Sequence, residues 1–524
     1  MTPTKQPLSL LASLWLCGCL LAACRPQPAP TQTAAATADA SIAQVSTAQV
    51  AILTPELTAT PPPARPLYDP GTLVDYTAQT GDNLIALAAR FNTTVREIRA
   101  ANPIIPDTAT TMPAGFPMKI PVYYRTYWGS QFQILPDSLY VNGPAQLDFD
   151  THAFVAAQPG WLKNYREYAA GQHRDGAGLV DLVAQNFSVS PRLLLALLEY
   201  QAGALSQPVL DDAIGPYMLG YEHQFHRGVY LQLVWAANTL NNAYYQWRNG
   251  KLIEFDRPDG TIYRPDPWQN AASVSLQEFF NTTLPQADFA TAIGPQGFIQ
   301  TYTDLFGDPW AADEPHIPGS LLQPELRLPS PPGELWSYTG GPHTGWGTGN
   351  PWAALDFAPG SETRGCVSTT SWALAMADGL VVRSEPGTVV LDLDGDGDER
   401  TGWVLFYLHL ATNGRAAAGQ QVQAGWPLGH PSCEGGSATG THVHIARKYN
   451  GEWIEAAGAL PFVMEGWTAG EGSGGSYTGT LTRLGQVVRA CTCSDAASSI
   501  VSRAAIVPFP TLQMLPSETA APNP

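Results

Sequence analysis

The chain has 524 residues, a formal net charge of -18 and only 14% charged residues. Domains usually run about 100 to 200 residues, so we expect two to four of them. The acidic balance repels nucleic acid phosphates and anionic lipid head groups, which excludes both as general partners. Few charges together with 49 Gly and 46 Pro residues fit a multidomain exported protein.

The first residues predict export. Lys5 precedes an apolar run at 8–23 that ends in small residues, which is the pattern of a secretory signal peptide over residues 1–23. The sequence Leu21-Ala22-Ala23-Cys24 resembles a bacterial lipobox, which implies a lipid on Cys24 and a lipoprotein held at the cell envelope by that anchor alone. The alternatives are cleavage elsewhere or an uncleaved anchor, although the run is short for a spanning helix.

Two segments have the composition of disordered chain. Residues 24–72 are dominated by Pro, Thr and Ala, with too few large apolar groups to offset the loss of chain entropy on folding. We expect a linker there and a similar disordered tail at 506–524.

Residues 73–122 predict a small strand-helix-helix-strand unit. Strand patterns at 74–78 and 119–122 enclose helical spacing at 84–91 and a capping box at Thr94-Val95-Arg96-Glu97 that opens a second helix. This order, with Tyr76-Thr77-Ala78-Gln79-Thr80-Gly81-Asp82-Asn83-Leu84 and Asn102-Pro103, resembles a LysM module. The resemblance implies binding of N-acetylglucosamine-containing glycans through Thr80, Gly81, Asp82, Asn83, Leu84, Asn102, Pro103 and Ile104. The alternative is a packing unit without sugar affinity.

Residues 125–310 predict a mainly helical domain. Ser190 can cap a helix with Pro191 in its first turn, and further helical patterns lie at 230–245 and 275–280. The segment 190–199 resembles, on one helix only, the acid-bearing helix of lysozyme-like transglycosylases. Glu199 is then either a general acid or a structural carboxylate, and Tyr200 stands where that family has Ser.

Five imidazole and carboxylate groups are concentrated between residues 343 and 444. Alternating polar and apolar residues at 440–446 predict a strand with His442 and His444 on one face. A second strand pattern, 404–410, contains His409 near its end, while Asp356 and His343 lie in other apolar or Gly-rich settings. A catalytic zinc needs three such ligands and an open position for water. The set therefore predicts one zinc with two spare imidazoles.

The same residues carry a family resemblance. Gly340-Gly341-Pro342-His343, Leu355-Asp356-Phe357, Tyr407-Leu408-His409 and Gly440-Thr441-His442-Val443-His444 resemble, in this order, the motifs of the lysostaphin and beta-lytic metallopeptidases. That family cuts peptide bonds in bacterial peptidoglycan. The resemblance implies that His343, Asp356 and His444 bind the zinc, and that His409 and His442 handle protons and the oxyanion. The long gap from His343 to Asp356 places the chain near the beta-lytic branch.

An acidic loop lies within the same region. Asp392-Leu393-Asp394-Gly395-Asp396-Gly397-Asp398 reproduces the first half of a calcium loop, but Trp403 replaces the acid at its twelfth position. The loop is either a weak calcium site made by Asp392, Asp394, Asp396 and Asp398 or a solvated acidic hairpin.

Four cysteines follow the export signal: Cys366, Cys433, Cys491 and Cys493. In an oxidising compartment they predict two disulfides, and the sequence leaves all three pairings open.

The expected architecture is multidomain: a βααβ LysM unit, a mainly α-helical middle domain and an antiparallel β-sheet metallopeptidase domain at 330–505. The expected function is an exported zinc endopeptidase that acts on peptidoglycan. The alternatives are a non-catalytic wall-binding protein that recruits or activates other hydrolases, and a glycosidase that acts through the middle domain. The sequence does not fix the oligomeric state.

Overall fold

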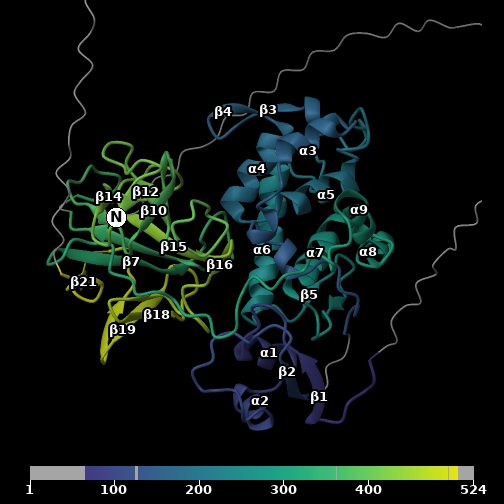
Figure 1. The fold of residues 1–524 in the computed structure, drawn as a ribbon, viewed down its shortest axis with the longest axis horizontal. Helices are drawn as coiled ribbons and strands as arrows, with labels where there is room; N and C mark the ends of the chain where they lie inside the picture. The colour runs from purple at the N-terminus through teal and green to yellow at the C-terminus, as the bar shows by residue number, and fades with distance from the viewer. Residues whose placement is uncertain (1–64, 124–127, 362, 494, 506–524) are drawn as a thin grey trace, which may run out of the picture. The chain divides into compact units, whose positions relative to one another are not determined.

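The computed structural model describes residues 65–123, 128–361, 363–493 and 495–505 (Figure 1). The predicted signal peptide, Cys24, most of the predicted linker and the predicted tail lie outside the described residues. Within the described ranges, no helix is both long and apolar enough to cross a membrane.

The predicted LysM unit has the expected strand-helix-helix-strand order. Its elements are β1 (Thr72–Thr77), α1 (Leu84–Arg90), α2 (Val95–Ala101) and β2 (Pro117–Val122). The two strands pair antiparallel, and the Thr94 and Glu97 side chains form the capping box at the start of α2. Val74, Tyr76, Leu87, Ile98 and Ile120 belong to one apolar core, so the unit buries its own hydrophobic face.

The middle region is mainly helical, as its sequence predicts (Figure 1). The Ser190 hydroxyl accepts a hydrogen bond from the Leu193 amide and Pro191 occupies the first turn, which explains why α5 begins there. The helices of this region are α3 (Thr151–Ala157), α4 (Gly176–Phe187), α5 (Pro191–Ala202), α6 (Val229–Arg248), α7 (Ala271–Thr283), α8 (Gln286–Ala292) and α9 (Phe298–Phe306). Short 3-10 turns and hairpins fill the connections: η1 (Asp137–Leu139), η2 (Pro144–Gln146), η3 (Trp161–Asn164), β3 (Arg166–Ala169), β4 (Gln172–Asp175), β5 (Phe255–Asp256) and β6 (Ile262–Tyr263).

A large antiparallel sheet forms the centre of the C-terminal region. Its strands run in the order β13-β10-β11-β12-β15-β8-β7-β21, with β16 paired to β15. They are β7 (Leu335–His343), β8 (Ala354–Pro359), β10 (Gly379–Glu385), β11 (Gly387–Asp392), β12 (Trp403–Leu410), β13 (Gln421–Val422), β15 (Val443–Tyr449), β16 (Glu452–Ile454) and β21 (Ser499–Val501). Smaller sheets are made by β9 (Ala373–Leu374) with β14 (Pro427–Gly429), and by β17 (Val463–Met464), β18 (Trp467–Glu471), β19 (Gly479–Arg483) and β20 (Gln486–Arg489).

Both faces of this sheet are buried at its strand β12. In β12, Leu405 and Tyr407 belong to one apolar cluster, whereas Val404, Phe406 and Leu408 belong to the cluster that also contains the helices. This alternation has the two-residue period of a strand, and it explains why β12 reads as a continuous apolar run. The strand that carries His409 is therefore packed on both of its faces.

Candidate metal centre

Strand register brings His343, Asp356 and His444 together. Asp356 of β8 lies directly opposite His444 of β15, so both side chains project from the same face. His343 ends β7 opposite Ala354, two residues before Asp356, and it shares that face as well. Three groups that are far apart in the sequence thus converge without any long flexible loop.

The potential ligand atoms form a compact triangle. His343 Nε2 lies 3.0 Å from His444 Nδ1 and 3.2 Å from Asp356 Oδ1, and His444 Nδ1 lies 3.4 Å from the same oxygen. Ligand atoms held tetrahedrally at zinc–nitrogen distances near 2.0–2.1 Å would be about 3.3 Å apart. Asp356 Oδ1 is also buried without a hydrogen-bond partner, so the donor set suits one zinc ion.

Backbone carbonyls fix the orientation of both candidate histidine ligands. His343 Nδ1 lies 2.8 Å from the Gly341 carbonyl, and His444 Nε2 lies 3.1 Å from the Gly345 carbonyl. A carbonyl oxygen can only accept, so these ring nitrogens carry the protons and the opposite nitrogens keep their lone pairs. The two lone pairs are the ones in the triangle, which is how proteins orient imidazole ligands.

The charges of the three groups reinforce one another. Burial opposes the ionisation of Asp356, but His343 and His444 hold its pKa well below 3.8. Burial would lower the pKa of His343, and the Asp356 carboxylate outweighs that effect and raises it. Burial lowers the pKa of His444. At neutral pH the triangle contains an ionised carboxylate and a neutral His444, which is the protonation state that metal binding requires of those two groups.

His409 reaches this face only through an unusual backbone conformation. The neighbouring Leu408 lies opposite His444, so regular alternation would turn His409 to the other face. Its φ of 64° lies in the left-handed region, and its ring instead lies 4.5 Å from that of His442 and 6.2 Å from that of His444, between centroids. Such a conformation costs about 1–3 kcal/mol in a residue other than glycine, and this strain is typical of functional positions.

His409 and His442 present matching ring nitrogens. His409 Nδ1 donates to the Glu434 carbonyl at 2.8 Å, and His442 Nδ1 donates to the Gly440 carbonyl at 2.7 Å. Each ring therefore keeps its lone pair on Nε2. Burial and the nearby His442 lower the pKa of His409 to about 4, so its imidazole is neutral at physiological pH. His442 Nε2 lies 3.8 Å from Asp356 Oδ2, which places it beside the triangle.

Tyr477 is a member of the site that our sequence reasoning missed. Its ring stacks on the His343 imidazole at 4.1 Å, and 49% of the residue is exposed. It lies in a Gly- and Ser-rich loop between β18 and β19, where no local pattern marks a functional residue.

The first predicted glycan loop is already occupied by contacts within the protein. The Asp82 carboxylate accepts hydrogen bonds from the Tyr76 hydroxyl and the Gln79 amide and forms an ion pair with Arg90. Thr80 is 8% exposed, and its carbonyl accepts a hydrogen bond from the Arg248 guanidinium at the end of α6.

Further contacts close this loop. The Asn83 amide donates to the Arg248 carbonyl, and the Asn83 oxygen caps α1. A side chain at Gly81 would collide with the Arg248 guanidinium, and Leu84 belongs to the LysM core. Arg248 is held in turn by buried ion pairs with Asp137 and Glu452.

The second predicted loop is different. Pro103 and Ile104 are exposed, with Ile104 at 77%. Asn102 is buried because its side chain bridges the Ile98 and Lys119 carbonyls. Of the two loops, the second therefore offers the more accessible surface.

The acidic loop brings together three of its four predicted residues. Carboxylate oxygens of Asp392, Asp394 and Asp396 lie within 4.8 Å of one another, which could hold a cation. Burial and the neighbouring Asp392 raise the pKa of Asp394 to about 6. Asp398 does not join them, because its carboxylate is bound to the Arg400 guanidinium at 2.6 Å and 2.8 Å.

Glu199 has a local structural role. Its carboxylate accepts hydrogen bonds from the Leu205 and Ser206 amides, at 2.7 Å and 3.1 Å, just beyond the end of α5. These bonds anchor the turn that follows the helix, in line with the structural alternative.

The cysteine pairing left open by the sequence is Cys366–Cys433 and Cys491–Cys493. The first disulfide links two loops beside the five-residue site, whereas the second spans a sequence separation of only 2.

Comparison with known proteins agrees with this layout. Residues 133–319 match the family described as LasA, N-terminal domain, and residues 76–121 match the LysM domain. Protease LasA of Pseudomonas aeruginosa (strain UCBPP-PA14) is 27% identical over 353 residues, which cover 62% of this chain and 76% of that protein. Beta-lytic metalloendopeptidase of Achromobacter lyticus is 31% identical over 141 residues, 25% of this chain and 35% of that protein.

Among solved structures, the M23 metalloprotease pseudoalterin from the deep sea is similar to 32% of this chain and 96% of its own, at 26% identity and a TM-score of 0.27. The two sequence relatives and the two matched families place the chain with the peptidases that its motifs resemble. The chain is thus a metalloendopeptidase that is similar to enzymes of the lysostaphin and beta-lytic type, and it carries an N-terminal LysM module.

Proposed function

We propose that this protein is a zinc-dependent endopeptidase that cleaves peptide bonds in bacterial peptidoglycan. The observation that carries the proposal is the triangle of His343 Nε2, Asp356 Oδ1 and His444 Nδ1, with sides of 3.0 to 3.4 Å. The imidazoles of His409 and His442 lie beside this triangle. Each donates through Nδ1 to a backbone carbonyl, so its Nε2 keeps the lone pair. A purely structural metal site would have no need of them.

The chain's own groups would divide the chemistry. When bound, zinc would supply Lewis acidity toward the peptide carbonyl and activate water for attack. His409, neutral because its pKa is near 4, would accept a proton at Nε2 and readily pass it to the leaving amine. His442, beside Asp356, would steady the developing oxyanion once its Nε2 is protonated.

Point variants separate these roles. Asp356→Ala should lose both zinc and activity, because it removes a ligand. His409→Ala should keep zinc near one ion per chain and lose about 100-fold or more in kcat. Stoichiometric zinc in Asp356→Ala would contradict the ligand assignment.

We further propose that the LysM module holds the glycan strands of the wall through the loop that contains Pro103 and Ile104. The exposure of that loop supports this assignment, while the Thr80 to Leu84 loop contacts α6. Removal of residues 73–122 should reduce pull-down with intact sacculi but spare the cleavage of soluble wall peptides. Pull-down equal to that of the full chain would remove the anchoring role.

Export and lipid attachment at Cys24 complete the proposal. Cys24→Ser should block incorporation of labelled fatty acid, and label retained on that variant would show that the lipobox interpretation is wrong.

The glycosidase alternative is tested by Glu199→Gln. That variant should leave peptide cleavage intact, and loss of reducing-end release from glycan in it would favour the alternative.

A further inference from the structure

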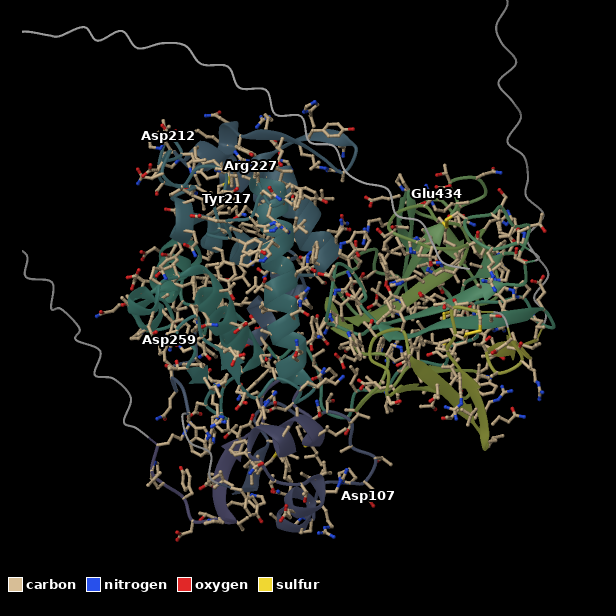
Figure 2. The ribbon with its side chains drawn as sticks, turned by 180° about the vertical axis from the view of Figure 1, so that it is seen from behind. Asp107, Asp212, Tyr217, Arg227, Asp259 and Glu434 are labelled. Atoms are coloured by element: carbon tan, nitrogen blue, oxygen red, sulfur yellow. A yellow bond between two sulfur atoms is a disulfide. The ribbon has the colours of Figure 1, made fainter. Side chains whose placement is uncertain are left out.

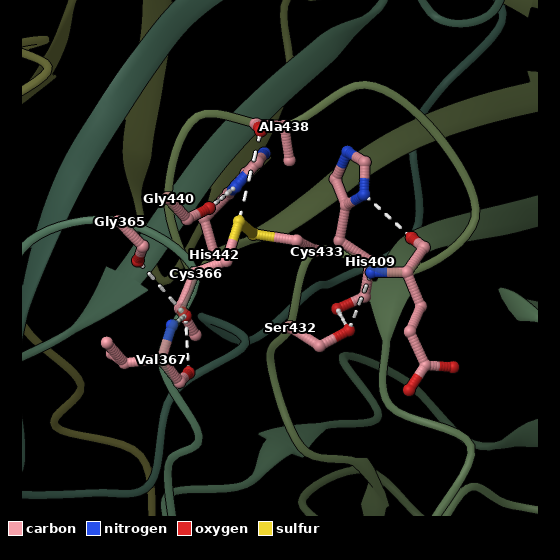
Figure 3. Close-up of a disulfide and its surroundings, with 11 residues drawn as sticks. Gly365, Cys366, Val367, His409, Ser432, Cys433, Ala438, Gly440 and His442 are labelled. Carbon is pink, nitrogen blue, oxygen red and sulfur yellow. Dashed lines mark hydrogen bonds between the residues drawn. A yellow bond between two sulfur atoms is a disulfide. The ribbon is translucent and has the colours of Figure 1, made fainter.

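The Cys366–Cys433 disulfide connects two loops that border the site (Figure 3). Cys366 lies between β8, which carries Asp356, and β9. Cys433 lies between β14 and β15, which carries His444. The residues on either side of Cys433 bind His409. The residues on either side of Cys366 bind Thr441, the neighbour of His442.

On the Cys433 side, both flanking residues hold His409. The Ser432 amide and hydroxyl donate to the His409 carbonyl at 2.7 Å and 3.0 Å (Figure 3). The Glu434 carbonyl accepts the proton of His409 Nδ1 at 2.8 Å. The Glu434 carboxylate accepts hydrogen bonds from the Thr412 amide and hydroxyl. Glu434 lies among the loops of the sheet region (Figure 2).

On the Cys366 side, both flanking residues hold Thr441, the neighbour of His442. The Thr441 amide donates to the Gly365 carbonyl at 3.1 Å. The Val367 amide donates to the Thr441 hydroxyl at 2.8 Å, and that hydroxyl donates to the Val367 carbonyl at 2.5 Å. The segment that aims His442 is therefore tied to Cys366 from both sides.

The metal triangle has different support. Asp356 and His444 are partners in the β8–β15 ladder, and His343 ends β7, so the pairing of strands holds all three. His409 lies at a strained position with a φ of 64°, and His442 precedes the first residue of β15. Strand pairing alone does not fix these two side chains, so the loops must.

We propose that the Cys366–Cys433 disulfide is a positioning element for His409 and His442, and that it does not serve zinc binding. This inference rests on the proposed function for the roles of the two imidazoles. By closing one loop against the other, the disulfide fixes the Glu434 carbonyl and Thr441 relative to each other. Loss of this disulfide should leave zinc bound but should let the His409 and His442 rings move out of the orientation that catalysis requires.

The test compares two double variants of the full chain. Cys366→Ser with Cys433→Ser should lower kcat at least tenfold, change KM less than threefold and keep zinc near one ion per chain. The matched control is Cys491→Ser with Cys493→Ser, which removes the other disulfide and should keep kcat within twofold. Full kcat in the first variant, or a loss of kcat accompanied by loss of zinc, would overturn the proposal.

A second pair of variants covers the case in which the first does not fold. Thr441→Val removes both hydroxyl contacts with Val367 and should lower kcat severalfold, whereas Thr441→Ser keeps them and should restore most of it. Equal activity of the Val variant and wild type would contradict the proposal.

A readout without catalysis separates this inference from the proposed function. In long-range nitrogen–proton spectra of histidine-labelled protein, His409 and His442 should both be the Nδ1–H tautomer. Without the Cys366–Cys433 disulfide, at least one ring should show a mixture of tautomers. If wild type cleaved no wall peptide, the proposed function would fail. The spectra would still test the positioning role, because ring signals that do not change when the Cys366–Cys433 disulfide is removed would contradict it.

Discussion

The metal centre and the first loop of the LysM module carry equally recognisable motifs, yet the structure uses them differently. His343, Asp356 and His444 converge with ligand atoms 3.0 to 3.4 Å apart. In the LysM loop, Thr80 and Asn83 contact Arg248 of α6. A motif on paired strands has its geometry fixed by register, whereas the accessibility of a loop motif depends on what packs against it.

The largest expected effect tests the metal side of this comparison. His444→Ala removes a proposed ligand that the ladder holds, so zinc should fall below a tenth of an ion per chain and cleavage should become undetectable. His442→Ala, two residues earlier, should keep zinc and lose about 100-fold or more in kcat. Metal content by mass spectrometry and peptide release check both results. Equal zinc in the two variants would erase the distinction between ligand and proton-handling histidines.

A second prediction concerns pH. Zinc binding displaces a proton from His343 wherever that imidazole is protonated, and Asp356 raises its pKa above 6.5. At pH values below the raised pKa of His343, zinc affinity should fall about tenfold per pH unit, because one proton competes with the metal. The lowered pKa values of Asp356 and His444 mean that neither adds to this slope near neutral pH. Competition titrations between pH 5.5 and 7.5 measure the slope, and a flat profile would contradict the prediction.

The LysM side of the comparison predicts a smaller effect. Ile104→Asp alters the exposed loop and should weaken binding of an N-acetylglucosamine oligomer about fivefold. Asn83→Ser keeps a residue suited to cap α1 but shortens the side chain that reaches Arg248, and it should change affinity less than twofold. Calorimetry on the full chain measures both. The opposite pattern would show that the first loop is open in solution.

The smallest effect belongs to the acidic loop. A cation would offset the burial and the repulsion that together raise the pKa of Asp394 to about 6, so millimolar calcium should raise Tm by about 2–4 °C. Asp394→Asn should remove this increment, whereas Asp398→Asn should keep it, since Asp398 is bound to Arg400. An identical Tm with and without calcium in wild type would favour the solvated hairpin.

Much of the fold and the site was predictable where local chemistry decides it. The capping box at Thr94 and Glu97, the start of α5 at Pro191 and the shared face of His442 and His444 follow from side-chain chemistry or strand periodicity. These features depend on neighbours within a few residues or on a two-residue period. They need no knowledge of the tertiary arrangement.

Other features depend on tertiary packing and could not be predicted. Alternation in β12 would turn His409 away from the site, and only the left-handed φ corrects it. Neither the stacking of Tyr477 on His343 nor the burial of Thr80 has a local sequence signal. The ion pair between Asp398, the fourth aspartate of the predicted calcium site, and the Arg400 side chain also has no local sequence signal.

The most direct test of the account is digestion of purified peptidoglycan by the full chain, with mass analysis of the fragments. The zinc-loaded protein should release fragments with new amino groups and intact glycan strands, and a chelator should stop the release until zinc is restored. New reducing or anhydro-sugar ends, or peptide cleavage at full rate by metal-free protein, would contradict the assignment of His343, Asp356 and His444 as the catalytic metal centre.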